Sequence, residues 1–219
     1  MDAIRIENLR SLTDTGFVDL KPITLLVGQN SSGKSSFLRF FPLLRQSVEA
    51  RTEGPISFYG RLVDFGSFQE ALNRKSEKQE MVFHFRMVFH FGLFPSGSDK
   101  FDIYLTLKIT KDKIREGILT KECLISFGGH QIKIEFDDSR KVRAFRVNTF
   151  DLLSDIKGDI FDEKTGYFLP RIEVIRNSDG KEENMRFADL RDHLSDSAIS
   201  EVEKKAIHLK RDKMLTNFL

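Results

Sequence analysis

Two short stretches near the start of the chain alternate apolar and polar residues. They are residues 3–9 and 16–20, and a polar turn separates them. Because a period of two places every second side chain on one face of a strand, we predict a β-hairpin here. Residues 23–27 (Ile-Thr-Leu-Leu-Val) are instead nearly continuous in apolar and β-branched residues, which is typical of a strand buried on both faces.

Helical spacing begins directly after residues 28–36, which are rich in glycine and serine. The apolar residues that follow this spacing are Phe37, Leu38, Phe41, Leu44 and Val48. They predict an amphipathic helix. Pro42 lies inside the run and has no backbone N–H to donate, so we expect it to cap or kink the helix near Phe41. Further on, Ser67 and Glu70 match a capping box and predict a second, short helix.

A period of two returns at Glu80 and continues to about residue 147. One face of a long predicted strand carries Met81, Phe83, Phe85, Met87, Phe89 and Phe91. Residues 119–127 and 131–136 alternate as well, and Gly128-Gly129 lies between them like the turn of a hairpin. We therefore predict an antiparallel sheet over residues 80–147, and one more strand at residues 171–176.

The last part of the chain changes back to helical spacing. Its apolar stripe consists of Phe187, Leu190, Leu194, Ala198, Val202, Ala206 and Leu209. We expect an amphipathic helix or helix pair that needs a partner to cover this stripe. The sequence then divides into a lobe at 1–79, a mostly antiparallel β subdomain at 80–184 and a helical segment at 185–219.

Composition narrows the class of protein. The 219 residues are 40% hydrophobic, which is enough for an ordinary core, and the net charge of +2 is too balanced for a protein coated everywhere in nucleic acid. The single cysteine, Cys123, excludes an intramolecular disulfide and a cysteine-only zinc cluster. No run approaches 18 apolar residues, and no basic-then-apolar leader opens the chain. We therefore expect a cytoplasmic protein that does not bind membranes.

Residues 28–35 satisfy the phosphate-loop pattern Gly-x-x-x-x-Gly-Lys-Ser, with a predicted strand before it and a predicted helix after it. Glycines let the backbone curl so that its N–H groups point at a β-phosphate. Lys34 supplies a mobile cation for the β- and γ-phosphates, Ser35 offers a hydroxyl to Mg²⁺, and Ser36 is placed to reach the α-phosphate. The predicted nucleotide-binding residues are Gly28, Gln29, Asn30, Ser31, Ser32, Gly33, Lys34, Ser35 and Ser36, and the expected cofactors are ATP and Mg²⁺.

The residues between the fixed positions of this loop, with asparagine at its third position, resemble those in the ATP-binding head of the ABC-type superfamily that includes the SMC, RecF and OLD proteins. Residues 6–12 (Ile-Glu-Asn-Leu-Arg-Ser-Leu) are similar to the opening of those heads. Residues 62–72 (Leu-Val-Asp-Phe-Gly-Ser-Phe-Gln-Glu-Ala-Leu) resemble a segment of bacterial AAA-family ATPases of anti-phage defence, such as the Septu and retron-associated ATPases. The resemblance covers about the first 75 residues.

The resemblance implies an α/β fold, namely the N-terminal lobe of a P-loop NTPase head of the ABC type, followed by the antiparallel β subdomain and the helical segment. It implies ATP hydrolysis, with Lys34 and Gln69 as catalytic residues. Arg10 is similar to the arginine that approaches the nucleotide from the end of the first strand. Gln69 lies roughly where such heads carry a glutamine that contacts Mg²⁺ and the attacking water, so Ser35 and Gln69 are the implied metal ligands. A surface arginine and an ordinary residue of a capped helix remain the alternatives for Arg10 and Gln69.

Heads of this type dimerise around ATP. The resemblance therefore implies a homodimer or higher oligomer, with control of DNA binding or of a companion nuclease or other effector, in antiviral defence. A basic run at residues 140–146 is a candidate path for DNA.

Hydrolysis in such heads also needs a carboxylate pair after four apolar residues, and no pair here satisfies that requirement. Asp162-Glu163 follows only two apolar residues, and Asp137-Asp138 follows an alternating, half-exposed run, so we interpret both as acidic turns. A signature Ser-Gly-Gly loop and a switch histidine are not recognisable either. We therefore expect an N-terminal half that holds a nucleotide without completing hydrolysis alone, with the remaining motifs beyond Leu219.

Two alternatives from other functional classes stay open. The first is a non-catalytic nucleotide-binding protein with an interaction or regulatory role, which the missing acidic pair favours. The second is a P-loop phosphotransferase. A compact kinase of that kind alternates parallel strands and helices after its loop, whereas this sequence turns to antiparallel strands.

Overall fold

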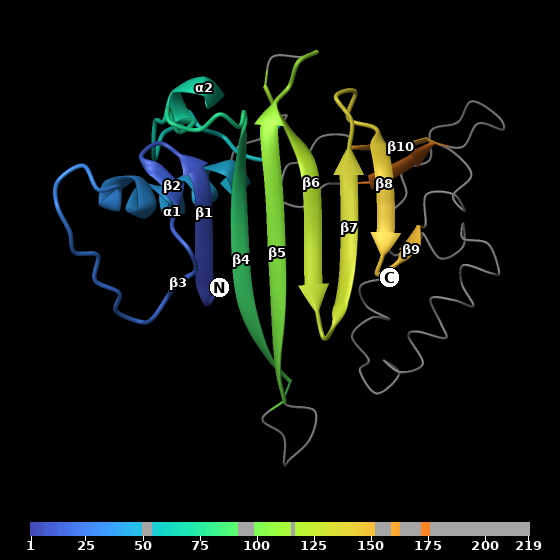
Figure 1. Cartoon of the computed structure of the whole chain (residues 1–219), viewed down its shortest axis with the longest axis horizontal. Helices are drawn as coiled ribbons and strands as arrows, with labels where there is room; N and C mark the ends of the chain where they lie inside the picture. Colours follow the sequence, from blue (N-terminus) through green and yellow to red (C-terminus); the bar gives the residue numbers. More distant parts are fainter. Residues whose placement is uncertain (50–53, 92–98, 115–116, 152–158, 163–171, 176–219) are drawn as a thin grey trace.

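The computed structural model describes residues 1–49, 54–91, 99–114, 117–151, 159–162 and 172–175. Within them, one long antiparallel sheet has the strand order β2-β1-β4-β5-β6-β7-β8-β9, and β3 pairs with β1 beside β2 (Figure 1). Its strands are β1 (Ala3–Leu9), β2 (Leu12–Asp14), β3 (Val18–Asp19), β4 (Glu80–Phe91), β5 (Asp99–Lys111), β6 (Ile118–Phe127), β7 (His130–Phe136), β8 (Val142–Val147) and β9 (Phe150–Asp151). A separate two-stranded sheet pairs β10 (Asp159–Asp162) with β11 (Ile172–Ile175).

The predicted hairpins and the predicted antiparallel sheet are confirmed. β1 pairs with both β2 and β3, and β6 turns into β7 through Gly128-Gly129, with Phe127 opposite His130. β1 also pairs with β4, so that Ile6 lies opposite Phe83. The strands of residues 1–79 and those of residues 80–147 therefore belong to one sheet and share one hydrophobic core.

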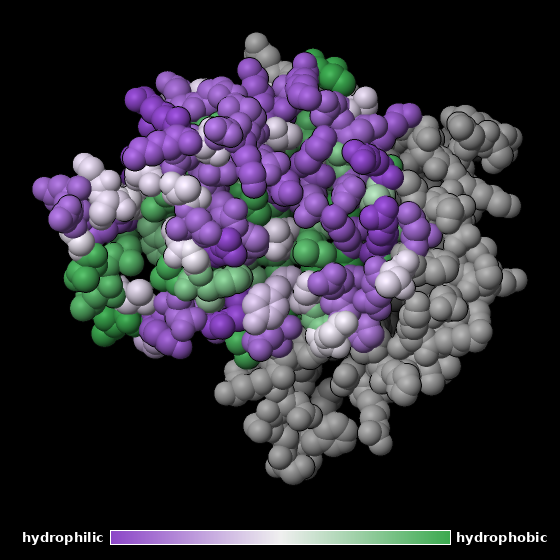
Figure 2. Space-filling view, viewed as in Figure 1, coloured by the Kyte–Doolittle hydropathy of each residue, from purple (hydrophilic) through white to green (hydrophobic). Residues whose placement is uncertain are grey.

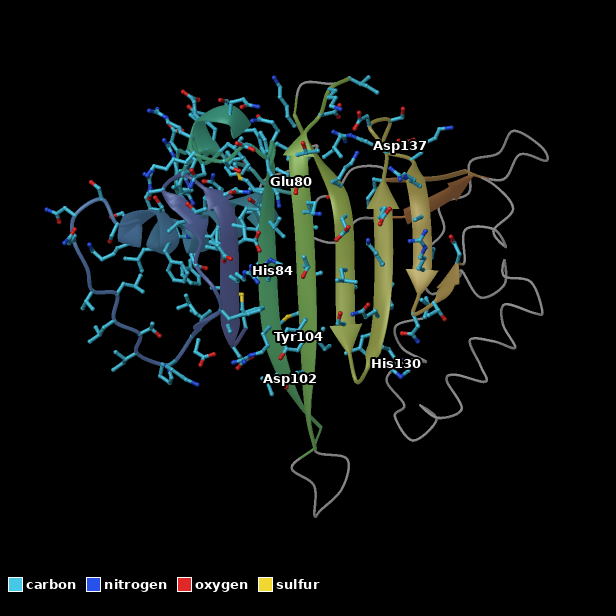
Figure 3. All side chains as sticks on the ribbon, viewed as in Figure 1. Glu80, His84, Asp102, Tyr104, His130 and Asp137 are labelled. Carbon is cyan, nitrogen blue, oxygen red and sulfur yellow. The ribbon has the colours of Figure 1, made fainter. Side chains whose placement is uncertain are left out.

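In the long strand β4, burial follows the alternation of apolar and polar residues in the sequence. Met81 and Phe83 are fully buried, whereas His84 and Arg86 on the other face stay partly exposed. Figure 3 shows His84 and Tyr104 on the face of the sheet turned toward the viewer. That face carries many polar and charged side chains (Figure 2). The side chains of the opposite, apolar face pack in the core with residues of α1 and of the loops.

Helix α1 (Lys34–Glu49) lies against the apolar face behind β1 and β4 (Figure 1). Phe37, Phe40 and Leu43 are its buried apolar residues, and the Phe40 ring stacks on Phe83 with the centroids 4.9 Å apart. Burial of one such side chain stabilises the fold by roughly 1.5–3 kcal/mol. The helix continues through Pro42 to Glu49, so of the two predicted effects of Pro42 the cap near Phe41 is wrong and the kink stays a prediction. Packing of the apolar stripe on the sheet outweighs the one backbone hydrogen bond that proline cannot donate.

Residues 23–27 differ most from the sequence prediction. They form no strand, and Ile23, Leu25 and Val27 are 81%, 82% and 88% exposed, so the predicted buried strand is wrong. Only Leu26 packs against the core. The segment lies in the loop between β3 and α1, where the space-filling view shows an apolar patch at the edge of the molecule (Figure 2). Apolar composition alone does not distinguish a buried strand from an extended segment that has no neighbour to pair with.

The two acidic candidates have different outcomes. Asp137 and Asp138 lie in the turn after β7, whose alternating burial confirms a half-exposed strand. Asp162 is the last residue of strand β10 in the small antiparallel sheet and not part of the predicted turn, whereas Glu163, the other residue of that acidic pair, lies outside the described residues. The predicted strand at residues 171–176 is confirmed as β11. The predicted helical segment at 185–219 lies outside the described residues.

Candidate phosphate-binding site

The loop that precedes α1 has the curled backbone that its sequence predicts. Gly28, Ser31 and Gly33 all have positive φ angles, of 150°, 64° and 100°. Gln29, Asn30, Ser31 and Ser32 are exposed, so the loop is open to solvent. Phe37 donates its N–H to the Gly33 carbonyl at 2.9 Å, which makes Gly33 the residue that starts the helix.

The second glycine of the loop lies against the β1–β2 turn. A Cβ atom on Gly33 would come within 2.5 Å of a Leu12 methyl group and 3.3 Å of the Ser11 hydroxyl. Together with its positive φ, this close approach requires glycine. The hairpin that opens the chain therefore supports the loop directly.

Lys34 folds back over the loop. Its ammonium group donates to the carbonyl oxygens of Gly28 and Gln29 at 2.7 and 2.6 Å, and it lies 3.4 Å from the Ser32 hydroxyl. The ammonium group is therefore held at the centre of the loop, where a phosphate chain would need a cation.

The start of α1 adds a second source of positive potential. The N–H groups of Lys34, Ser35 and Ser36 precede the first hydrogen bond of the helix and have no partner inside it. The first turn contains no acidic residue, so nothing in the helix itself neutralises its positive end. Ser35 is exposed and its hydroxyl is free to face Mg²⁺, which accepts one protein oxygen together with water and phosphate oxygens.

Two arginines meet beside this loop at one aromatic ring. The guanidinium carbons of Arg10 and Arg39 lie 5.5 and 5.0 Å from the centre of the Phe65 ring. Arg10 donates to the Phe65 carbonyl at 3.1 Å, and Arg39 donates to the Asp64 carbonyl at 2.7 Å. Arg10 therefore lies in the turn whose following residues, Ser11 and Leu12, contact Gly33 of the loop, and its contact with a nucleotide stays a prediction. The sequence analysis missed Arg39 and Phe65, although helical spacing from Ser35 to Arg39 was a usable signal.

A buried amide fixes the segment that carries Phe65. Gln46 of α1 is 5% exposed and makes four hydrogen bonds to the backbone of residues 57–63. Its Nε2 donates to the carbonyls of Ser57 and Val63 at 2.6 and 3.0 Å, and its Oε1 accepts the N–H groups of Leu62 and Val63. The helix that begins at the phosphate loop is therefore tied to the segment leading to Phe65.

Gln69 lies on α2 (Phe68–Ala71), whose predicted capping box is confirmed. The Ser67 N–H donates to the Glu70 carboxylate at 2.7 Å, and hydrogen bonds from Ser67 lower the pKa of Glu70 below its ordinary value. Gln69 is exposed and lines a cavity of about 480 Å³ together with Tyr59 and Lys111. None of the described residues that line this cavity comes from the loop 28–36, and the catalytic role of Gln69 stays a prediction.

Three of the acidic and basic candidates outside the loop, Asp137, Asp138 and Arg140, make contacts within their own part of the sheet. Asp137 accepts N–H groups of its own turn, and Asp138 forms ion pairs with Lys113 and Lys121. Arg140 is ion-paired with the buried Asp112 at 3.0 Å. Among the described residues, no group of three or more histidine, cysteine, aspartate or glutamate side chains is placed to hold a metal ion.

Comparison with known protein families gives one match. The model of the family described as "AAA ATPase domain" matches residues 1–217. No curated protein and no solved structure matches the chain. Within the described residues, no helix has the length and apolar character needed to cross a membrane.

Proposed function

Because the chain belongs to the AAA ATPase domain family, we propose that residues 28–36 bind ATP with Mg²⁺, and that the protein is an ATPase head of the SMC, RecF and OLD type. The observation that carries the proposal is the loop itself. Its backbone is curled at three positive-φ positions, its lysine is held over the curl, and the start of a long helix follows it. These are the parts that a triphosphate chain requires.

Each part has a separate chemical task in the proposed complex. The loop N–H groups and the first turn of α1 bind the β-phosphate, and Lys34 exchanges its carbonyl partners for β- and γ-phosphate oxygens. The Ser35 hydroxyl binds Mg²⁺, which neutralises charge on the phosphates. Arg10 stands at the flank of the loop as a further cation.

Dimerisation around ATP is the proposed link to a partner. The exposed residues Gln29–Ser32 leave the outer side of the loop open to a second head. We propose that closure of two heads controls DNA binding or a companion nuclease in antiviral defence. The similarity of residues 6–12 and 62–72 to heads of that kind supports this part.

Replacement of Lys34 by alanine tests nucleotide binding. We expect the change to abolish binding of labelled ATP, since Lys34 is the cation of the loop. The circular dichroism spectrum should stay unchanged, because in the described part of the chain the hydrogen bonds of the Lys34 ammonium group go to the loop carbonyls and Ser32. Lys78→Ala, at an exposed turn residue, is the matched control. ATP binding by Lys34→Ala at the affinity of the unchanged protein would contradict the proposal.

A non-catalytic, nucleotide-binding regulator is the second candidate. The engagement of Asp137 and Asp138 in a turn and in ion pairs favours it, because neither carboxylate is free to orient a water molecule. ATP turnover measured separately from ATP binding distinguishes the two. Binding without turnover, alone or with a second copy, supports the regulator; transfer of the γ-phosphate to a small acceptor instead of water would indicate a phosphotransferase.

A further inference from the structure

Arg10 and Arg39 differ from most other arginines of the described chain in forming no ion pair with a carboxylate, although the positive charge of Arg10 helps to lower the pKa of the nearby Glu70 carboxyl. Five of the others are ion-paired, namely Arg5 with Asp14, Arg45 with Glu49, Arg86 with Asp19, Arg140 with Asp112 and Arg146 with Asp151. In the described residues, the two guanidinium groups contact the Phe65 ring and donate to the backbone carbonyls of Phe65 and Asp64, and the backbone N–H of Arg10 donates to the Ala71 carbonyl. Arg39 has no carboxylate among these partners, whereas Arg10 also interacts with the charge of Glu70. Two cations held at one ring repel each other, and an anion between them would relieve that repulsion.

The position of Arg39 on α1 indicates which anion this is. Arg39 follows Ser36 by three residues and Ser35 by four, so the three side chains share one face of the helix. Its Cα lies about 4.5 Å further along the axis than that of Ser36, and side chains of a helix lean toward its N-terminus. The guanidinium group is therefore directed back toward the level of Ser36, beside the phosphate loop.

Arg10 reaches the same place from the sheet. It lies in the turn whose next two residues, Ser11 and Leu12, contact Gly33 of the loop. Phe65 is almost completely buried, and Gln46 fixes the segment before it, so the ring is a rigid support for both guanidinium groups. Each guanidinium group donates one N–H to a backbone carbonyl and has further N–H donors that can bind a ligand.

We propose that Arg39, held with Arg10 on Phe65, is a nucleotide-binding residue that contacts the α-phosphate of the bound nucleoside di- or triphosphate. This inference rests on the proposed function. It adds a second cationic contact, separate from Lys34, on the side of the nucleotide that lies next to Ser36. A contact with the α-phosphate is made equally by ADP and ATP, whereas a contact with the γ-phosphate is made by ATP alone.

Titration calorimetry of the full chain with ATP and with ADP, both with Mg²⁺, tests this assignment. We expect Arg39→Ala to weaken the affinity for both nucleotides by a similar factor of about ten, which is typical of one charge-assisted hydrogen bond. Arg45→Ala is the matched control, because Arg45 is an exposed arginine of the same helix whose ion pair is with Glu49. Phe65→Leu keeps an apolar side chain without the π-face, and it should weaken the affinity for both nucleotides by a smaller factor than Arg39→Ala does.

Each other outcome overturns a defined part of the inference. Unchanged affinities in Arg39→Ala, with ATP binding still dependent on Lys34, overturn the role of Arg39 and leave the proposed function standing. A weaker affinity for ATP with an unchanged affinity for ADP overturns the α-phosphate assignment. If Arg45→Ala weakens both affinities as much as Arg39→Ala does, the effect is one of overall charge, and the role of Arg39 is overturned. If the unchanged protein binds neither nucleotide, the proposed function itself fails. Arg39→Lys keeps the positive charge, so its affinity for both nucleotides should fall by a smaller factor than in Arg39→Ala. This variant replaces Arg39→Ala in the test if the alanine variant does not fold.

Discussion

Gly33 is a residue at which the phosphate loop lies close against the β1–β2 turn. Its φ of 100° is strained for any side chain, and a Cβ atom would also collide with Leu12. The residue therefore serves the shape of the loop and the packing of the hairpin at once. Sequence alone indicates the first requirement through the motif, but not the second, because Leu12 lies 21 positions away.

Gly33→Ala should separate these two requirements. We expect the free energy of unfolding to fall by about 1–3 kcal/mol and ATP binding to be lost, because the strained backbone and the collision both displace the loop. Gly16→Ala is the control: Gly16 also has a positive φ, of 60°, but open space surrounds its Cβ position. It should cost only about 1 kcal/mol and leave binding unchanged. Equal losses in a urea titration would contradict the role of the collision.

At the scale of single elements, α1 is joined to the following segment by a polar contact inside the core. Gln46 donates two hydrogen bonds and accepts two, which satisfies backbone groups of residues 57–63 that have no strand partner there. A side chain of similar size without polar atoms would leave the Ser57 carbonyl and the N–H groups of Leu62 and Val63 without this partner, whereas the Val63 carbonyl would keep the N–H of Gly60.

Gln46→Leu should therefore lower the free energy of unfolding by roughly 2–4 kcal/mol, about the sum expected for three backbone groups that lose their partner. Arg45→Ala, one residue away on the exposed side, should change it by less than about 0.5 kcal/mol. Chemical denaturation followed by circular dichroism measures both. A loss of the same small size in both variants would mean that water replaces the amide.

Local signals in the sequence predicted elements whose partners are also local. The capping box of α2 and the Gly-Gly turn between β6 and β7 depend on residues a few positions apart, and the structure confirms both. The alternation of β4 succeeded because one face needs burial whatever the order of the strands. Residues 23–27 and 160–162 could not be assigned in this way, since pairing of a strand depends on which other segment lies beside it.

At the scale of the whole molecule, the apolar patch of residues 23–27 is the main departure from a protein that hides its hydrophobic residues. Neighbouring side chains there have opposite environments, because Leu25 is 82% exposed while Leu26 packs against the core. Exposed apolar segments without strand partners favour association with other chains.

Leu25→Lys and Leu26→Lys form a matched pair for this region. We expect Leu25→Lys to leave the melting temperature unchanged and to reduce self-association, since it removes only exposed apolar surface. Leu26→Lys should lower the free energy of unfolding by about 1–3 kcal/mol, because it places a charge against the core. Differential scanning calorimetry and light scattering measure both effects. Equal destabilisation by the two changes would indicate that residues 23–27 form the buried strand that the sequence predicts.

The contacts of Lys34 set a limit on how tightly the protein can hold any ligand at its loop. The carbonyls of Gly28 and Gln29 compete with a ligand for the ammonium group. Because they belong to the same chain, this competition does not depend on the protein concentration. The contribution of Lys34 to the free energy of binding is therefore the difference between its interaction with the ligand and its interaction with the two carbonyls. A change that loosened the carbonyl contacts would tighten binding without adding a single new contact to the ligand.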